Sequence, residues 1–265
     1  GMGIKALVLS EGEKAEIEWS KEDWGYWRKV KQIILGGFIP EAGEEAEVLI
    51  KGAKDFLRGV GLDYIKIEKA PLRGKEAGIL GTVAYVISQR NLSLKEEEET
   101  QVGILAVDFG RTHIGTGIVL VDPASGNLIG DLNEAIVYRD DTEVKIWIDI
   151  PNGGTREDRE KLINQIVDEI IKGIKYAEEH AIPVARDIGI CSPGLLDKEG
   201  YFIGGVEYLP FWDRDFHLPS VIEKELNWRG YPGYKVHILN DGNAQVLGNV
   251  KYGFCLLYTS PSPRD

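Results

Sequence analysis

The sequence predicts an α/β fold with a mixed sheet, and three observations support this. Short apolar or β-branched segments alternate with segments whose apolar residues recur at helical spacing. Two apolar segments, 104–107 and 114–121, are joined by a short polar turn, which indicates an antiparallel strand pair. Three of the expected strands end in polar or glycine-rich turns, at Asp108, Ser192 and Asn240. Ligands of such sheets bind beyond the strand ends, so we expect these turns to face one cleft.

The N-terminal third shows two apolar strand patterns and two helical patterns. The expected elements are a strand at 32–35, a helix over 44–57, a strand at 64–67 and a largely apolar, buried helix over 75–87. The stretch 91–100 is polar and contains four consecutive glutamates, which is typical of a solvated linker between domains.

After the hairpin, strand and helix patterns continue to alternate. The clearest helix follows Thr155, because Thr155 and Asp158 have the spacing of a capping box and apolar residues then recur at every fourth position. The other expected elements are a strand within 130–150 that alternates over 144–148, a strand at 187–191, a helix at 218–226, a strand at 235–239 and a helix over 243–250.

Composition and charge narrow the class of protein. The 265 residues suffice for one large domain or two smaller ones, and the formal net charge of −12 disfavours a general nucleic-acid binder. Cys191 and Cys255 provide neither a disulfide framework nor metal-ligand spacing. No segment is apolar for long enough to span a bilayer, and no signal-peptide pattern occurs. We therefore expect a cytoplasmic protein with small-molecule partners, no nucleic acid and no membrane, and leave a homo-oligomer open.

The turn after the strand 104–107 suits a phosphate group with its Mg²⁺. Asp108 ends a buried strand, where a carboxylate is costly unless a charged group meets it. Gly110 lets backbone N–H groups approach an oxyanion, and Thr112 adds a hydroxyl donor. We therefore place Asp108 near the metal, and Gly110 and Thr112 near phosphate oxygens. The plain alternative is a hairpin in which Asp108 and Thr112 merely satisfy the turn.

Three motifs, in this order, resemble the first lobe of the ROK sugar kinases, which belong to the actin-like ATPase superfamily. They are Asp-Phe-Gly-Arg-Thr at 108–112, Gly-Ile-Cys-Ser-Pro-Gly at 189–194 and Val-His-Ile-Leu-Asn-Asp-Gly-Asn-Ala at 236–244. The resemblance covers 101–254, and the three motifs together are much more specific than any one of them. It implies an actin-like ATPase (ribonuclease H-like) lobe with a mixed sheet, and a second lobe only partly present.

The resemblance also implies a function, the ATP-dependent phosphorylation of a hexose or N-acetylhexosamine, as in glucokinases. Asp241 corresponds to the base that takes the proton from the sugar hydroxyl attacking the γ-phosphate. Asn240 corresponds to a residue that binds sugar hydroxyls, and Pro193 and Gly194 to a loop closing one side of the sugar pocket. The residues that correspond to the turn for ATP phosphates and Mg²⁺ are Asp108, Gly110 and Thr112.

Several alternatives stay open. The segment 240–243 alone suits a plain strand-to-helix turn with Asp241 or Asn243 as helix cap. Arg111 stands where the family usually has a second glycine, so it either strains the turn or adds a phosphate contact. Tyr208 stands where the family often has asparagine, so ordinary glucose recognition is not implied. The competing functions are a non-catalytic, sugar-sensing ROK regulator and another actin-like phosphotransferase.

The N-terminal part resembles the end of a ROK chain, so the order of the parts is unusual. Gly36 and Gly37 correspond to a glycine pair that contacts adenosine. We therefore expect a nucleotide-side segment over 1–90, the linker 91–100 and the first lobe over 101–254, as a circular permutation or a junction of tandem modules.

The last residues, 255–265, resemble a translated sequencing adaptor. The cysteine-rich zinc loop of the family does not occur in the sequence, so we expect a structural zinc only in a downstream region. On this resemblance, the 265 residues alone are expected to have no appreciable kinase activity.

Overall fold

The structure is a computed structural model that describes residues 30–36, 43–89, 100–110, 112–144, 155–203 and 216–253. The chain divides into two compact units between Gly74 and Lys75. Several positions singled out in the sequence lie outside the described residues: Gly37, most of the linker 91–100, Arg111, Tyr208 and the C-terminal stretch 255–265.

The first unit contains a strand-helix-strand motif. Strands β1 (Gln32–Leu35) and β2 (Lys66–Lys69) pair in parallel, and helix α3 (Gly43–Gly59) lies between them in the sequence. Buried side chains of α3, of the turn after it and of β2 form a small core, namely Ile50, Leu57, Leu62, Ile65 and Ile67. The strand β2 begins two residues later than expected because Ile65 belongs to the turn that follows α3, where its N–H donates to the carbonyl oxygen of Leu62 at 3.0 Å.

The second unit is built on a five-stranded sheet with the order β5-β4-β3-β6-β7. The strands are β3 (Val102–Phe109), β4 (His113–Val121), β5 (Ile136–Glu143), β6 (Asp187–Ser192) and β7 (Lys235–Asn240). The pairs β3–β4 and β4–β5 are antiparallel, whereas β3–β6 and β6–β7 are parallel. The predicted α/β fold with a mixed sheet is therefore confirmed.

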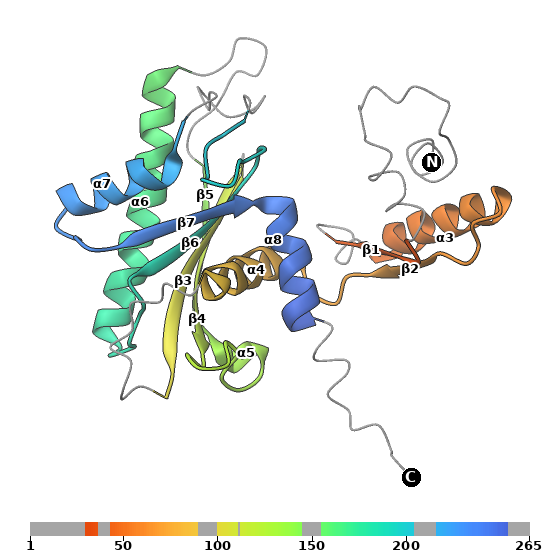
Figure 1. Ribbon diagram of the computed structural model, residues 1–265, viewed down its shortest axis with the longest axis horizontal. Coiled ribbons are helices and arrows are strands. Elements are labelled where there is room, and N and C mark those ends of the chain that lie inside the picture. Colours follow the sequence, from red (N-terminus) through yellow and green to blue (C-terminus); the bar gives the residue numbers. More distant parts are fainter. Residues whose placement is uncertain are drawn as a thin grey trace. The chain divides into compact units, whose positions relative to one another are not determined.

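Helices cover both faces of this sheet (Figure 1). Helix α6 (Arg156–Glu179) and helix α7 (Leu218–Trp228) pack on one face, and α4 (Gly74–Ser88) and α8 (Asp241–Gly248) lie on the other. The predicted capping box of α6 is present, with Thr155 and Asp158 each accepting from the other's backbone N–H. Short elements complete the unit, α5 (Leu132–Ala135) before β5 and the π-helical turn η3 (Asn249–Gly253) after α8.

Within the second unit, helix α4 packs against α8 and the sheet through glycines on both sides of the contact. A Cβ on Gly81 would lie 1.7 Å from the carbonyl oxygen of Ala244, and one on Gly248 would lie 2.2 Å from the carbonyl oxygen of Ala77. On the sheet, a Cβ on Gly189 would lie 2.4 Å from Cγ2 of Thr82. Because α4 is held this closely, the units divide at Gly74, earlier in the chain than the boundary expected near residue 90.

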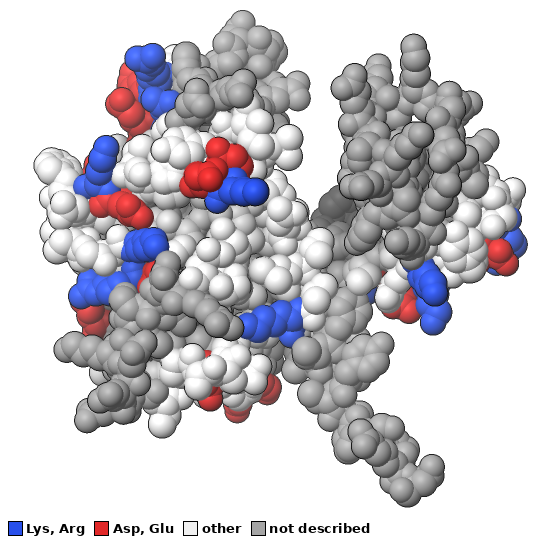
Figure 2. All heavy atoms as spheres, in the orientation of Figure 1, with Lys and Arg blue, Asp and Glu red and all other residues white. Residues whose placement is uncertain are grey.

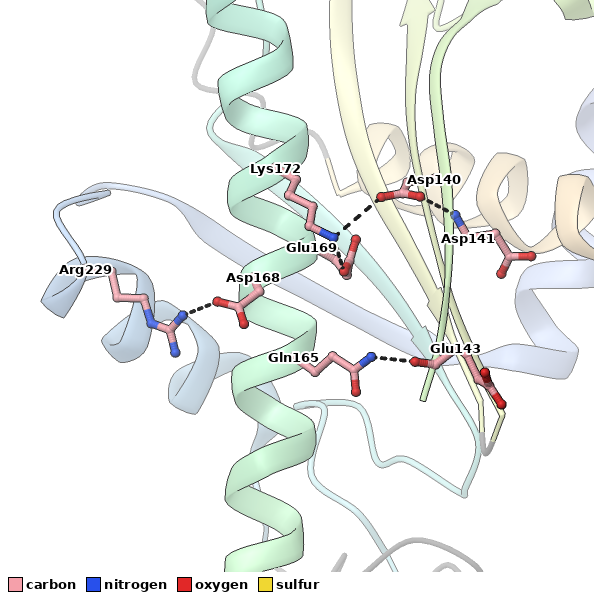
Figure 3. A network of polar contacts seen from close by, with 8 residues as sticks. All are labelled: Asp140, Asp141, Glu143, Gln165, Asp168, Glu169, Lys172 and Arg229. Carbon is pink, nitrogen blue, oxygen red and sulfur yellow. Dashed lines mark hydrogen bonds and ion pairs between the residues drawn. The ribbon is translucent and has the colours of Figure 1, made fainter. Parts of the chain in front are cut away.

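Strand β5 forms the sheet edge on the side of α6, and polar side chains fix it there (Figure 3). The Nζ atom of Lys172 donates to Glu169 Oε1 at 2.7 Å and lies 3.8 Å from Oδ2 of Asp140 on β5. Gln165 donates to the carbonyl oxygen of Glu143 at 2.7 Å. These contacts hold β5, which pairs with β4, against α6.

Charged residues are mixed on the face shown in Figure 2, where lysine and arginine lie mostly beside aspartate and glutamate. Within the described ranges, no helix combines the length and the apolar character that crossing a bilayer requires.

Candidate functional site

The three predicted turns meet at one edge of the sheet. Asp108 on β3 is the register partner of Cys191 on β6. Ser192, the next residue of β6, is the partner of Asn240 on β7. The three strand ends therefore lie at one edge of the sheet, because parallel strands present their C-terminal ends on the same side. That the three turns face one cleft stays a prediction.

The carboxylate of Asp108 is enclosed between strand β6 and helix α4. The thiol of Cys191 donates to its Oδ1 at 3.1 Å. Burial raises the pKa of Asp108 from 3.8 to about 6, and the thiol hydrogen bond opposes this rise. The negative charges of Asp241 and Asp141 raise the pKa of Asp108 further, whereas the positive charge of Lys75 lowers it. A carboxyl with such a pKa gains from a bound cation, since the cation favours its ionised form.

Some backbone groups of the hairpin turn between β3 and β4 are already hydrogen-bonded within the protein. The N–H of Gly110 donates to the carbonyl oxygen of His113 at 2.9 Å, so this donor is engaged within the turn. The side chain of Thr112 is exposed, and its carbonyl oxygen accepts from the N–H of Val144 at 2.8 Å. No atom lies within 4 Å of a Cβ built on Gly110. The protein itself thus leaves room for a side chain at Gly110, and only a closely bound ligand would require glycine there.

Asn240 and Asp241 form the start of helix α8. Asn240 is its N-cap, with Oδ1 accepting from the N–H of Asn243 at 3.2 Å, so the cap is neither Asp241 nor Asn243. The helix begins at Asp241, two residues before the expected start, because this cap precedes it. Oδ1 of Asp241 accepts from the N–H of Gly242 at 2.8 Å and from Nδ2 of Asn240 at 3.0 Å. Both of these hydrogen bonds are accepted by the same oxygen, Oδ1, and they fix the orientation of the carboxylate.

The loop after β6 is tied to this same turn. Gly194 has a φ of +106°, which suits glycine, and its carbonyl oxygen accepts from Nδ2 of Asn240 at 2.9 Å. Pro193, directly before it, is buried. Both hydrogens of the Asn240 amide are therefore engaged within the protein, so only its Oδ1 could contact a ligand, as an acceptor.

A cavity of about 440 Å³ opens beside Asp108. Its lining comes from α4, the β3–β4 hairpin and β5, and includes the predicted residues Asp108, Gly110 and Thr112. It also includes two cations that the sequence did not indicate, Lys75 and Arg139. Lys75 pairs with Asp141, and Nη1 of Arg139 lies 3.0 Å from Oε1 of Glu76. The partners lie more than sixty residues apart in the sequence, so no local pattern reveals them.

A magnesium ion fits this donor set only together with phosphate oxygens. Among the described residues, no three histidine, cysteine, aspartate or glutamate side chains come together as a metal site. Mg²⁺ in phosphate-transfer sites is held by one or two carboxylates, substrate phosphates and water. Asp108 provides one such carboxylate at the wall of the cavity.

The other residue predicted for nucleotide contact lies in the first unit. Gly36 directly follows β1, and its neighbour Gly37 is outside the described residues.

No protein-family model matches the sequence, and no curated protein matches it. Solved structures similar to the chain include the inorganic polyphosphate/ATP-glucomannokinase of Arthrobacter sp. strain KM. It is 19% identical, with a TM-score of 0.39, over 57% of this chain and 49% of that chain. A putative N-acetylmannosamine kinase from Listeria monocytogenes is 23% identical, with a TM-score of 0.35, over 58% of this chain and 40% of that chain.

A ROK family transcriptional regulator, a homolog of the E. coli MLC protein, is also similar. It is 15% identical, with a TM-score of 0.33, over 52% of this chain and 27% of that chain. The matched part of the chain thus spans about half of the length of these structures or less. Because all these TM-scores lie below 0.5, the functional proposals below rest on the geometry of the site.

Proposed function

We propose that this protein takes part in the ATP-dependent phosphorylation of a hexose or N-acetylhexosamine, with Asp241 as the base. The observation that carries this proposal is that two carboxylates, Asp108 and Asp241, lie at one edge of the sheet, and that Asp108 lines a cavity together with two cations, Lys75 and Arg139. Phosphoryl transfer depends mainly on positioning and electrostatics, and one carboxylate for a metal with another for a proton meets that need.

The two carboxylates have different surroundings, and this difference supports different roles. Asp108 is enclosed by α4 and Cys191, which suits a group that holds a cation away from water. Asp241 is partly exposed at the start of α8, and its Oδ1 is held by two hydrogen bonds. A carboxylate held in this way presents its second oxygen in a fixed direction, as a general base requires.

In the proposed reaction, Oδ2 of Asp241 accepts the proton of a sugar hydroxyl while that hydroxyl oxygen forms a bond to the γ-phosphorus of ATP. The bond between that phosphorus and the bridging oxygen breaks, and ADP leaves with the electron pair. A Mg²⁺ ion held by Asp108 would neutralise charge on the phosphates. In this proposal Gly110 and Thr112, which line the cavity, bind the phosphates. Asn240 and the loop at Pro193 and Gly194, which are joined by a hydrogen bond outside that lining, bind the sugar.

The direct test is a coupled assay with ATP, Mg²⁺ and a panel of hexoses and N-acetylhexosamines. It is run on the natural full-length protein that contains these residues and, beside it, on the 265-residue chain. We expect transfer by the full-length protein and turnover far below the ordinary enzyme scale of ~1 s⁻¹ by the chain alone. Transfer needs both lobes around the substrates, because closure excludes water.

The same panel separates this function from its alternatives. Sugar binding by the full-length protein without any phosphoryl transfer would indicate a sugar-sensing regulator. Transfer to an acceptor other than a sugar would indicate another phosphotransferase. If neither sugar nor ATP binds, the proposed function is wrong.

A further inference from the structure

The cavity beside Asp108 has an unfavourable charge for a phosphate ligand. Four described carboxylates line it, those of Glu76, Asp108, Asp140 and Asp141. Two fully charged cations line it as well, Lys75 and Arg139. The formal charge of this lining is therefore −2, which one Mg²⁺ ion cancels. Phosphate binding then depends on both Lys75 and Arg139, because the removal of either one leaves the lining with a net negative charge even when the metal is bound.

Of these two cations, Lys75 has the greater freedom to reach a ligand. The Arg139 guanidinium is held against Glu76, whose side chain is only 20% exposed. The Lys75 side chain is 68% exposed, and its ammonium group pairs with Asp141. An ammonium group has three N–H donors, so Lys75 can keep Asp141 and still donate to a phosphate oxygen.

Asp141 on β5, the partner of Lys75, is held in place through its neighbour Asp140, which contacts α6 on the other face of the sheet. The backbone N–H of Asp141 donates to Oδ1 of Asp140 at 2.8 Å, and Asp140 in turn faces Lys172 of α6 (Figure 3). Oδ1 of Asp141 also lies 3.3 Å from Nδ1 of His113. Lys75 is thereby positioned between β5 and the hairpin turn, at the rim of the cavity that contains Asp108.

We propose that Lys75 binds a phosphate oxygen of the ligand in this cavity, from helix α4, together with a Mg²⁺ ion at Asp108. The inference extends the function proposed above, since it names the residue that offsets the carboxylates around the nucleotide's phosphates. The ligand class is a magnesium-complexed polyphosphate, as in the phosphate chain of a nucleoside triphosphate.

The test uses Mg²⁺ with inorganic tripolyphosphate, which needs neither a sugar site nor an adenosine site. Binding to the whole chain is measured by isothermal titration calorimetry. We expect Lys75→Gln to raise the Kd at least ~10-fold, the scale of one lost charge-assisted hydrogen bond, and Lys75→Arg to keep it within ~3-fold. The matched control is Lys175→Gln, an exposed lysine on α6 outside the cavity lining, which should change the Kd by less than ~2-fold.

Folding is checked by circular dichroism, and Lys75→Gln should stay folded because an exposed ion pair contributes little stability. Equal Kd values for the parent chain and Lys75→Gln overturn the inference, as does a parent chain that does not bind tripolyphosphate with Mg²⁺. Binding that depends on Lys75, in a full-length protein that phosphorylates no sugar, keeps this inference and removes the proposed function. Sugar phosphorylation with an ATP KM unchanged by Lys75→Gln keeps the function and removes the inference.

Discussion

Gly78 lies so close to Asp108 that a Cβ built on Gly78 would stand 2.2 Å from Oδ2 and 2.8 Å from Cγ of the carboxylate. Any side chain at this position must displace either the helix or the carboxylate. Because Gly78 has no side chain, α4 can approach Asp108 closely enough to enclose its carboxylate.

We expect Gly78→Ala to destabilise the second unit by about 1–3 kcal/mol, the usual cost of an extra methyl group in a packed site. Urea unfolding measures this change. The matched control is Gly52→Ala on α3, where no atom lies within 4 Å of the added Cβ. That variant should be more stable by about 0.5–1 kcal/mol, because alanine is favoured over glycine in a helix. Stabilisation by both variants would contradict the close contact at Asp108.

Gly81→Ala should be more damaging than Gly78→Ala. Its Cβ would lie 1.7 Å from the carbonyl oxygen of Ala244, and a backbone atom cannot rotate away as a side chain can. We expect faster amide hydrogen exchange along α4 and α8, measured by mass spectrometry, with exchange in α6 changed less. Unchanged exchange in α8 would show that the two helices do not depend on each other.

Asp108→Asn should stabilise the folded chain at neutral pH while removing metal and phosphate binding. Folding raises the pKa of this carboxyl to about 6, so the folded state binds more protons than the unfolded state between about pH 4 and pH 6. The free energy of unfolding of the parent chain therefore falls as pH rises through this window. The difference from the ordinary value of 3.8 corresponds to roughly 3 kcal/mol at pH 7.

Urea unfolding at several pH values between 4 and 7 tests this, with the exposed Asp63→Asn as control. The gap in stability between Asp108→Asn and the parent should widen from pH 4 to pH 6 and then stay constant. A gap that is constant over the whole range would mean that Asp108 is not buried as described.

Asp241→Asn should abolish sugar phosphorylation in the full-length protein and leave its fold intact. Asparagine can keep the hydrogen bonds from Gly242 and Asn240, but it cannot accept a proton. The loss in kcat should be at least ~10²-fold, the scale of a general base. The control Glu160→Gln removes an exposed carboxylate on α6 and should have no effect. A variant with near-parent kcat would remove Asp241 from the mechanism.

The sequence predicted the strand ends of this site well, for a simple geometric reason. Asp108, Cys191 and Asn240 each close a short apolar segment, and parallel strands bring such ends together. Helix α6 was also predictable, because its apolar period and its cap at Thr155 are local signals.

The sequence did not reveal the cations around the cavity. Lys75 and Arg139 meet their partners through the docking of α4 on the sheet, and that docking depends on glycines such as Gly78 and Gly81. From the sequence alone, a glycine in a helix indicates only low helix propensity and does not show that another element packs closely against it.

A strand was expected within 130–150, and β5 lies there at Ile136–Glu143, but not over the alternating residues 144–148 that indicated it; residues 145–150 are outside the described residues. The charged residues Arg139, Asp140 and Asp141 resemble a loop in sequence. They fit a strand at the sheet edge because α4 and α6 supply partners for them on opposite faces.

The glycine contacts between α4 and α8 also matter during synthesis, because the ribosome makes α8 long after α4. Helix α4 has buried residues around most of its circumference. One face packs on the sheet, and another finds its partner only when α8 has been made. At about 5–20 residues per second, a ribosome needs roughly 10–30 s to add the ~170 residues between Gly81 and Gly248. During this interval the face of α4 that packs on α8 stays exposed on the nascent chain, which makes it a target for chaperones and a starting point for aggregation.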